Sequence, residues 1–166
     1  MSWIILVGAV AVVLFGFVVL FGAPYLPSLK SQIDVALDLV NLSEGQHLLE
    51  LGCGDGKVII AAAEKGLYVT GYELNPILAC IAWLRTRKYQ GRVKIVWGNF
   101  WRYTLPPADG IFVFLLPKYM NKLNKKIIQE TSRPVKLVSF AFRIPDRVVT
   151  AQKEGVFLYS YKPADK

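Results

Sequence analysis

Three closely spaced glycines are the first feature of this sequence that points to chemistry. Residues 49–60 read LELGCGDGKVII, with Gly52, Gly54 and Gly56 between an apolar run and a stretch of small residues. Glycine lets the backbone approach a ligand closely, and free N–H groups at a helix start favour a carboxylate. The spacing differs from the dinucleotide pattern G-x-G-x-x-G, and no G-K-[ST] follows, so phosphate is disfavoured. Because Glu50 could attract an amine or a sulfonium, the stretch predicts a zwitterionic ligand.

Two later polar residues extend this site toward a nucleoside. Glu73 lies 21 residues after Gly52, at the end of a predicted strand, where a carboxylate accepts hydrogen bonds from both ribose hydroxyls. Asn99 follows the next strand, so its amide oxygen could accept from an adenine amino group while Phe100 or Trp101 packs on the ring. Each residue alone also suits a tight turn or a solvated strand end. Together they favour ligand binding.

Alternating strands and helices are expected to position these residues. Apolar periodicity and end signals, such as Asn75 and Pro76 at a helix start, define the elements. Helices are predicted at 31–42, 57–65, 76–87 and 118–130, and strands at 47–51, 68–72, 93–97, 110–115 and 135–142. The tail 147–162 reads as a hairpin turning near Glu154 and Gly155. The pattern predicts an α/β fold: a Rossmann-like three-layer αβα sandwich with a mostly parallel sheet and a C-terminal antiparallel hairpin.

The N-terminal segment 3–22 has twenty residues and no charge. As a helix it would reach roughly 30 Å, the thickness of a bilayer core. A signal peptide fits less well because a basic start and a cleavage site are missing, and a buried core helix would show a polar face. We therefore expect a transmembrane anchor at 1–23, a linker and helix at 24–45, and a main domain at 46–166. Lys30 follows the apolar segment and nothing basic precedes it, which predicts a cytoplasmic main domain.

Charge is divided unevenly along the chain. Residues 24–84 carry a net charge of −4, and residues 85–147 carry +11. Beside a membrane anchor, such basic character favours attraction to anionic lipid headgroups. Nucleic acid is an unlikely partner, and a merely solvated face is the plain alternative. The two cysteines, Cys53 and Cys80, have no C-x-x-C spacing, so neither a disulfide nor a metal site is indicated.

The motif E-x-G-x-G-x-G at 50–56, with Glu73 and Asn99, resembles the class I S-adenosylmethionine-dependent methyltransferases. The flanks narrow the likeness. An apolar N-terminal segment, PYLPS at 24–28, GCGDGKVIIAAAEKG at 52–66 and GYELNP at 71–76 are similar to the small membrane-anchored protein-lysine methyltransferases of the ATP synthase c subunit and the adenine nucleotide translocase. The resemblance is most specific at residues 52–66 and 71–76, and it fades after Leu116.

The resemblance implies S-adenosyl-L-methionine as cofactor and assigns roles by position. The family ties its P-[FY]-x-P-[ST] stretch to cofactor binding and activity, which here indicates Pro24, Tyr25, Pro27 and Ser28. The other implied cofactor-binding residues are Glu50, Gly52, Cys53, Gly54, Gly56, Glu73, Leu74, Asn99 and Phe100.

Two departures from the family pattern are visible. Asn99 replaces an acid on the adenine side, which keeps an acceptor but loses a charge. The segment LLPKYM at 115–120 lacks the [DN]-P-P-[YFW] signature of amide and adenine N-methyltransferases, which disfavours a DNA adenine or glutamine target.

For a lysine substrate, the catalytic contribution expected is alignment in a dry site. Tyr25, Pro117 and Tyr119 are the predicted catalytic residues, the tyrosines as walls of a lysine channel. No general base is evident, and His47 starts a strand at the end away from the ligand. The helix at 118–130 is expected to pack an apolar side on the sheet and to turn a lysine stripe toward the membrane.

Three functions stay open. The first is a membrane-tethered methyltransferase for lysine in an integral membrane protein. The second is a methyltransferase for a lipid or a small apolar molecule, and the third is a non-catalytic nucleoside-binding module.

Overall fold

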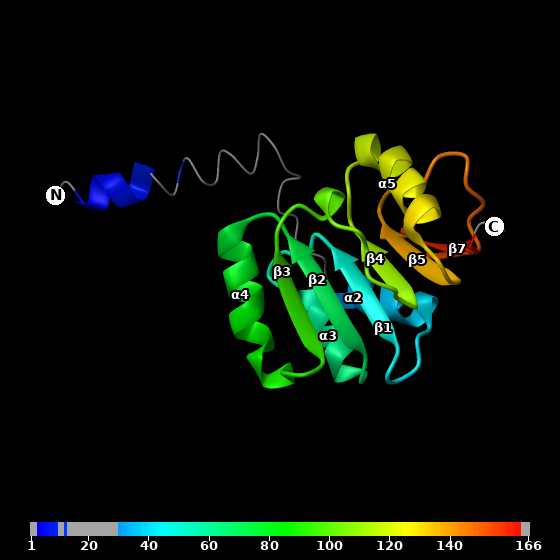
Figure 1. Cartoon of the computed structure of the whole chain (residues 1–166), viewed down its shortest axis with the longest axis horizontal. Coiled ribbons are helices and arrows are strands. Elements are labelled where there is room, and N and C mark those ends of the chain that lie inside the picture. The colour runs from blue at the N-terminus through cyan, green and yellow to red at the C-terminus, as the bar shows by residue number, and fades with distance from the viewer. Residues whose placement is uncertain (1–2, 10–11, 13–29, 164–166) are drawn as a thin grey trace.

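The computed structural model describes residues 3–9, 12 and 30–163 of the chain. Residues 30–163 form a seven-stranded sheet with helices on both faces (Figure 1). The strands are β1 (His47–Leu51), β2 (Tyr68–Glu73), β3 (Val93–Trp97), β4 (Gly110–Val113), β5 (Val135–Phe140), β6 (Ala151–Lys153) and β7 (Val156–Tyr161). The helices are α2 (Lys30–Val40), α3 (Lys57–Glu64), α4 (Pro76–Thr86) and α5 (Pro117–Glu130), with short 3₁₀ turns η1 (Arg87–Tyr89) and η2 (Phe100–Arg102).

The strand order is β3-β2-β1-β4-β5-β7-β6. The five strands from β1 to β5 pair in parallel, and β7 runs antiparallel to both β5 and β6. The order reverses between β1 and β4, which is where open α/β sheets bind ligands, at the carboxyl ends of the strands. Glu154 and Gly155 have φ of 48° and 77° and form the turn of the final hairpin, as predicted. The predicted α/β fold is confirmed.

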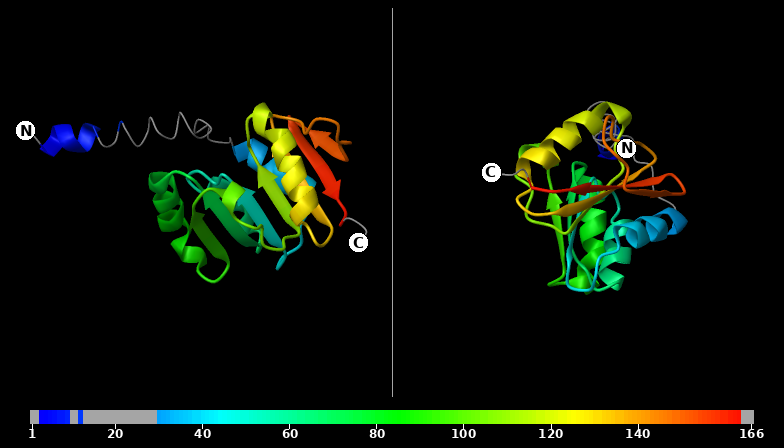
Figure 2. Two further views of the ribbon diagram at one scale, coloured as in Figure 1. Left: turned by 45° about the horizontal axis from the view of Figure 1, so that its top comes forward. Right: turned by 90° about the vertical axis from the view of Figure 1, so that its right-hand side faces the viewer.

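Helices cover both faces of the sheet (Figure 2), and an apolar layer holds them to each face. On one face, α2 and α3 contribute Ala36, Val40, Ile59 and Ala62 to a buried cluster with β1 and β2. On the other face, α5 packs Met120, Leu123 and Ile127 against β4, β5 and β7. The loop that follows β3 covers the end of β2 on this second face, where the rings of Tyr72 and Tyr103 are 5.6 Å apart.

Three predicted elements end two residues earlier than expected, and in two cases the backbone gives the reason. Helix α2 stops at Val40 because Asn41 adopts a left-handed conformation with φ of 43°. Strand β5 stops at Phe140, not 142, because Ala141 does the same with φ of 67°. Strand β4 stops at Val113, not 115; the ring of the next residue, Phe114, packs against Phe140 at 4.7 Å.

The predicted transmembrane segment lies mostly outside the described residues. Residues 3–9 and 12 are helical. Within the part of the chain that the structure describes, no helix is both long and apolar enough to cross a bilayer.

Candidate active site

The glycine turn after β1 is tied to the end of β2. The backbone N–H groups of Gly52 and Cys53 both donate to the carbonyl of Tyr72, each at 2.9 Å. Gly52 has φ of 98°, and a Cβ placed on it would meet no atom of the described residues within 4 Å. The positive φ demands glycine, and the exposed side of this residue faces open space. The turn therefore leaves backbone accessible to a ligand.

The third glycine serves helix packing instead. Gly56 begins α3 with φ of 83°, and a Cβ there would lie 3.2 Å from the Cβ of Ala82 on α4. A fourth glycine, Gly71 in β2, has a similar role: its Cβ would lie 2.7 Å from Ile59 Cδ1 and 2.9 Å from Cys53 Sγ. No role was predicted for Gly71, although a glycine inside a strand often marks a position that another part of the chain approaches closely.

Glu73 is fixed at the carboxyl end of β2, beside the glycine turn. Its Oε2 accepts from the N–H of Gly54 and its Oε1 from the N–H of Asn75, both at 2.8 Å. The residue is buried. Since a carboxylate oxygen can accept two hydrogen bonds, each oxygen keeps a lone pair for a ligand hydroxyl. This arrangement suits the predicted ribose contact.

Glu50 has a buried carboxyl group whose hydrogen bonding is incomplete. Among the described residues its Oε2 has no hydrogen-bond partner. Burial raises the pKa of Glu50 well above its usual range, the carboxylates of Glu73 and Asp55 raise it further, and a hydrogen bond from the Ile59 backbone lowers it. A buried polar atom without a partner is costly. A cationic or hydrogen-bonding ligand group would relieve that cost.

Cys53 lies within the same turn but is not a nucleophile. Its side chain is buried, and this burial raises the pKa of the thiol far above its ordinary value, with the neighbouring Glu50 adding to the effect. A thiol held in the neutral form is unreactive. Cys53 therefore serves packing in the turn.

Hydrogen bonds between side chains and the backbone position two of the residues predicted to lie beside the adenine. Asn99 Oδ1 accepts from the N–H of Trp101 at 3.1 Å and so caps η2. Leu74 is fixed by Trp97, whose indole Nε1–H donates to its carbonyl at 3.2 Å. Phe100 is buried, with its ring centroid 4.4 Å from that of Trp101. The Asn99 oxygen thus already has one partner, and the predicted adenine contact would have to share it.

An aromatic wall joins η2 to the start of α5. Helix α5 begins at Pro117, and the ring of Tyr119 lies 6.1 Å from that of Trp101. The ammonium of Lys118 lies 5.0 Å from the Tyr119 ring centroid, and that of Lys122 lies 4.5 Å from the Trp101 centroid. These rings therefore already attract amino cations. The other predicted site residues, Pro24, Tyr25, Pro27 and Ser28, lie outside the described residues.

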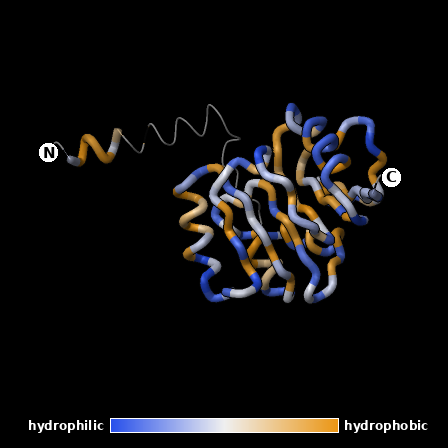
Figure 3. The backbone as a smooth tube through the Cα atoms, in the orientation of Figure 1, coloured by the Kyte–Doolittle hydropathy of each residue, from blue (hydrophilic) through white to orange (hydrophobic). Residues whose placement is uncertain are grey.

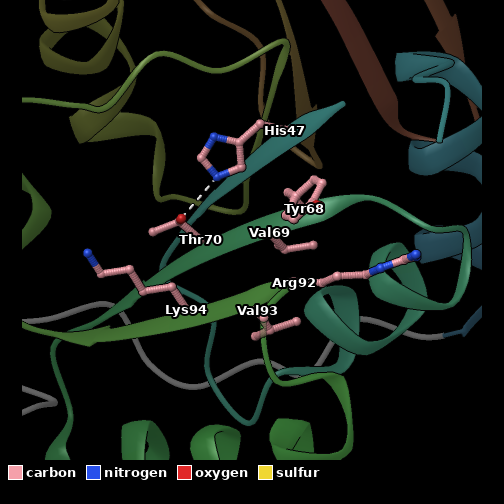
Figure 4. Close-up of a pocket in the computed structure, with 8 residues that line it drawn as sticks. His47, Tyr68, Val69, Thr70, Arg92, Val93 and Lys94 are labelled. Atoms are coloured by element: carbon pink, nitrogen blue, oxygen red, sulfur yellow. Dashed lines mark hydrogen bonds between the residues drawn. The ribbon is translucent and has the colours of Figure 1, made fainter. Parts of the chain in front are cut away.

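A shallow groove of about 400 Å³ lies at the opposite end of the sheet. It is formed where β1, β2 and β3 begin, and includes His47, Thr70 and Lys94 (Figure 4). His47 Nε2 shares a hydrogen bond with the Thr70 hydroxyl at 2.9 Å, and Nδ1 lies 3.0 Å from the Pro107 carbonyl. His47 is thus distant from the glycine turn, as expected.

The sheet order and the features at its carboxyl edge together define a class of protein. Among the described residues, the open space over Gly52, the oxygen of Glu50 that lacks a partner and the fixed carboxylate of Glu73 fit the amino acid and ribose parts of S-adenosylmethionine. The fold is that of a class I S-adenosylmethionine-dependent methyltransferase, and this edge of the sheet suits its cofactor.

Comparison with known proteins gives the family. The model of the ANTKMT methyltransferase domain matches residues 50–151, more than half of the chain. The chain belongs to this methyltransferase family.

Two relatives with lysine N-methyltransferase activity in their names are similar to this chain. The chain is 30% identical to a protein-lysine N-methyltransferase of Saccharolobus islandicus (strain REY15A) over 148 residues, which covers 82% of this chain and 92% of that protein. It is 30% identical to the human lysine N-methyltransferase of the ATP synthase c subunit over 124 residues, 74% of this chain and 53% of that one. The chain therefore spans about half the length of this human relative.

A solved structure shares the fold. An RNA methyltransferase from Salinibacter ruber in complex with S-adenosyl-L-homocysteine superposes with a TM-score of 0.76 at 25% identity, over 85% of this chain and 96% of that one.

Proposed function

We propose that this protein transfers a methyl group from S-adenosylmethionine to a lysine side chain of an integral membrane protein. The observation that carries the proposal is the aromatic wall of Trp101 and Tyr119, which holds ammonium groups of the chain's own lysines beside the cofactor edge. A substrate lysine has the same chemistry. The names of the relatives support the same acceptor.

The residues of the site would act by alignment and exclusion of water. The cofactor supplies an electrophilic methyl on a positively charged sulfur. Glu73 and the backbone at Gly52 would hold the cofactor, while Trp101 and Tyr119 would enclose the acceptor. An ammonium has no lone pair, so the lysine must first release its proton to solvent, and burial between apolar walls favours the neutral amine. Proximity then supplies much of the rate enhancement.

We further propose that residues 3–22 anchor the protein in a membrane with the methyltransferase domain on the cytoplasmic side. The support is the uncharged length of that segment and the lysine that follows it at position 30. Residues 23–29 separate the segment from α2, and seven residues extend at most about 25 Å. Target lysines would therefore lie close to the bilayer, as in short loops between transmembrane helices.

The test combines purified full-length protein, tritiated S-adenosylmethionine and host membranes from a strain that lacks the gene. We expect the label to run with a small membrane protein and mass spectrometry to find increments of 14 Da, or multiples, on a lysine. A protein carrying Glu73→Ala is the control and should give no label. Label that extracts into organic solvent would favour lipid methylation, label in nucleic acid would exclude a protein acceptor, and absence of label with retained cofactor binding would indicate a binding module.

A further inference from the structure

Helix α4 turns three large apolar residues toward solvent, which is unusual for a helix at a protein surface. Its buried face is formed by Ala79, Ala82 and Thr86. Ile77, Ile81 and Leu84 lie on the opposite side and are 48%, 38% and 51% exposed. Their spacing of four and three residues makes one continuous stripe. A surface helix normally turns such a stripe toward the core.

The small inward face has a packing reason, but among the described residues the outward stripe packs against no other part of the domain. A Cβ at Gly56 would come within 3.2 Å of the Cβ of Ala82, so α4 lies very close to the glycine turn and meets it with a small residue. Helix α5 shows the usual arrangement, with Met120, Leu123 and Ile127 fully buried. In Figure 3, α4 is accordingly mostly orange, whereas α5 is mostly blue.

One tryptophan and two arginines lie beside the stripe. Trp97, at the end of the neighbouring strand β3, is 67% exposed. Arg85 and Arg87 fall to either side of the stripe at roughly 100° per residue. Arg85 is ion-paired with Asp55 of the glycine turn, and Arg87 lies 5.1 Å from the ring centroid of the exposed Trp83, which is farther from the stripe. Tryptophan concentrates at membrane interfaces, and arginine binds anionic headgroups there. An exposed apolar stripe with a tryptophan and arginines beside it therefore suits contact with the interface of an anionic bilayer.

We propose that α4 lies in the surface of an anionic membrane, with Ile77, Ile81, Leu84 and Trp97 as the contact, hereafter the α4 face. This inference rests on the proposed tethering, which keeps the domain beside a bilayer. It replaces the lysine stripe of α5 as the main membrane contact. Helix α4 begins three residues after Glu73, so docking brings the cofactor edge to the headgroups, where a loop lysine of a membrane protein would arrive.

The chain carries a natural probe for this contact. Cys80 is exposed on α4, next to Ile81, whereas Cys53 is buried. A nitroxide reagent should therefore label Cys80 alone. Full-length protein would be reconstituted into vesicles of equal parts phosphatidylcholine and phosphatidylglycerol. Relaxation by oxygen, which concentrates in lipid, would be compared with relaxation by a water-soluble nickel chelate. A second label at Val148→Cys in a Cys80→Ser protein gives the control, because Val148 is 86% exposed on another surface.

We expect the Cys80 label to respond to oxygen and to be shielded from nickel, and the label at position 148 to respond to nickel. Ile81→Glu should raise the nickel response at Cys80 to the level at position 148. The matched variant Ile128→Glu, at an apolar residue on α5 that is 45% exposed, should leave it unchanged.

Equal nickel access at both sites on vesicle-bound protein would overturn the proposal, as would shielding from both reagents, which would mean that protein covers the α4 face. Because the readout needs no methyl transfer, it separates failure of this contact from failure of the proposed activity.

Discussion

Two buried carboxyl groups beside the glycine turn have different environments, and this difference assigns their tasks. Glu73 accepts two backbone hydrogen bonds that fix both of its oxygens. Glu50 leaves one oxygen without a partner among the described residues. Glu73 is therefore ready to receive ribose hydroxyls, and Glu50 has a buried oxygen at which a hydrogen-bond donor of a ligand would be favoured.

Removing the Glu73 carboxylate should weaken cofactor binding. We expect Glu73→Ala to raise the dissociation constant of S-adenosylmethionine at least tenfold, about 1.4 kcal/mol, by calorimetry. Glu64→Ala, which removes an exposed carboxylate on α3, should have no effect. Thermal unfolding checks that the variant is folded, since two backbone N–H groups lose their acceptor. Unchanged affinity in Glu73→Ala and in Gly54→Val would refute the assigned cofactor site.

Glu50 should make stability depend on pH in a direction set by its raised pKa. The folded protein holds the Glu50 proton more tightly than the unfolded chain, so this group favours folding at low pH. That contribution is lost as pH rises from the ordinary value of 4.5 toward the raised folded pKa. Glu50→Gln keeps the shape without the charge. In urea unfolding without ligand, the unfolding free energy of the variant should rise relative to that of the parent as pH rises above 4.5. If the advantage of the variant instead became smaller with rising pH, the argument from burial would be contradicted.

At the scale of elements, α5 offers a matched pair of neighbours that tests its packing. Ile127 is fully buried against the sheet, while Ile128 is 45% exposed. Ile127→Ala should cost about 2–5 kcal/mol of unfolding free energy because it leaves a cavity. Ile128→Ala should change it by no more than about 0.5 kcal/mol, as is usual for a surface site. Equal costs in denaturant titrations would mean that α5 packs differently.

For the whole molecule, the membrane anchor can be tested by charge. Full-length protein should resist extraction of membranes with alkaline carbonate. Replacing Leu14 and Val18 with arginine should release it, because each arginine at a helix centre costs about 2.5–3.5 kcal/mol of insertion. The same two positions replaced with isoleucine provide the control. Release of the parent protein, or retention of the arginine variant, would remove the anchor from the proposed function.

The sequence alone determined the order of elements and the chemistry of the cofactor edge. Local signals were sufficient for this: the glycines of the turn, the cap formed by Asn75 before Pro76, and the apolar runs of the strands. Asn75 Oδ1 does accept from the N–H of Ile77 at 2.9 Å. Element ends were less predictable, because the left-handed conformations of Asn41 and Ala141 depend on packing that composition does not encode.

Only the tertiary structure decided which residues meet. The spacing of Gly52, Gly54 and Gly56 looked uniform, yet Gly52 faces open space while Gly56 is pressed against α4. The structure also revealed Gly71 as a packing requirement, Trp101 beside Tyr119, and the outward stripe of α4. Helical periodicity shows that a helix has an apolar side, but not which side faces the sheet. That choice depends on how closely the backbones approach, and here α4 meets the glycine turn with the small residues Ala82 and Thr86.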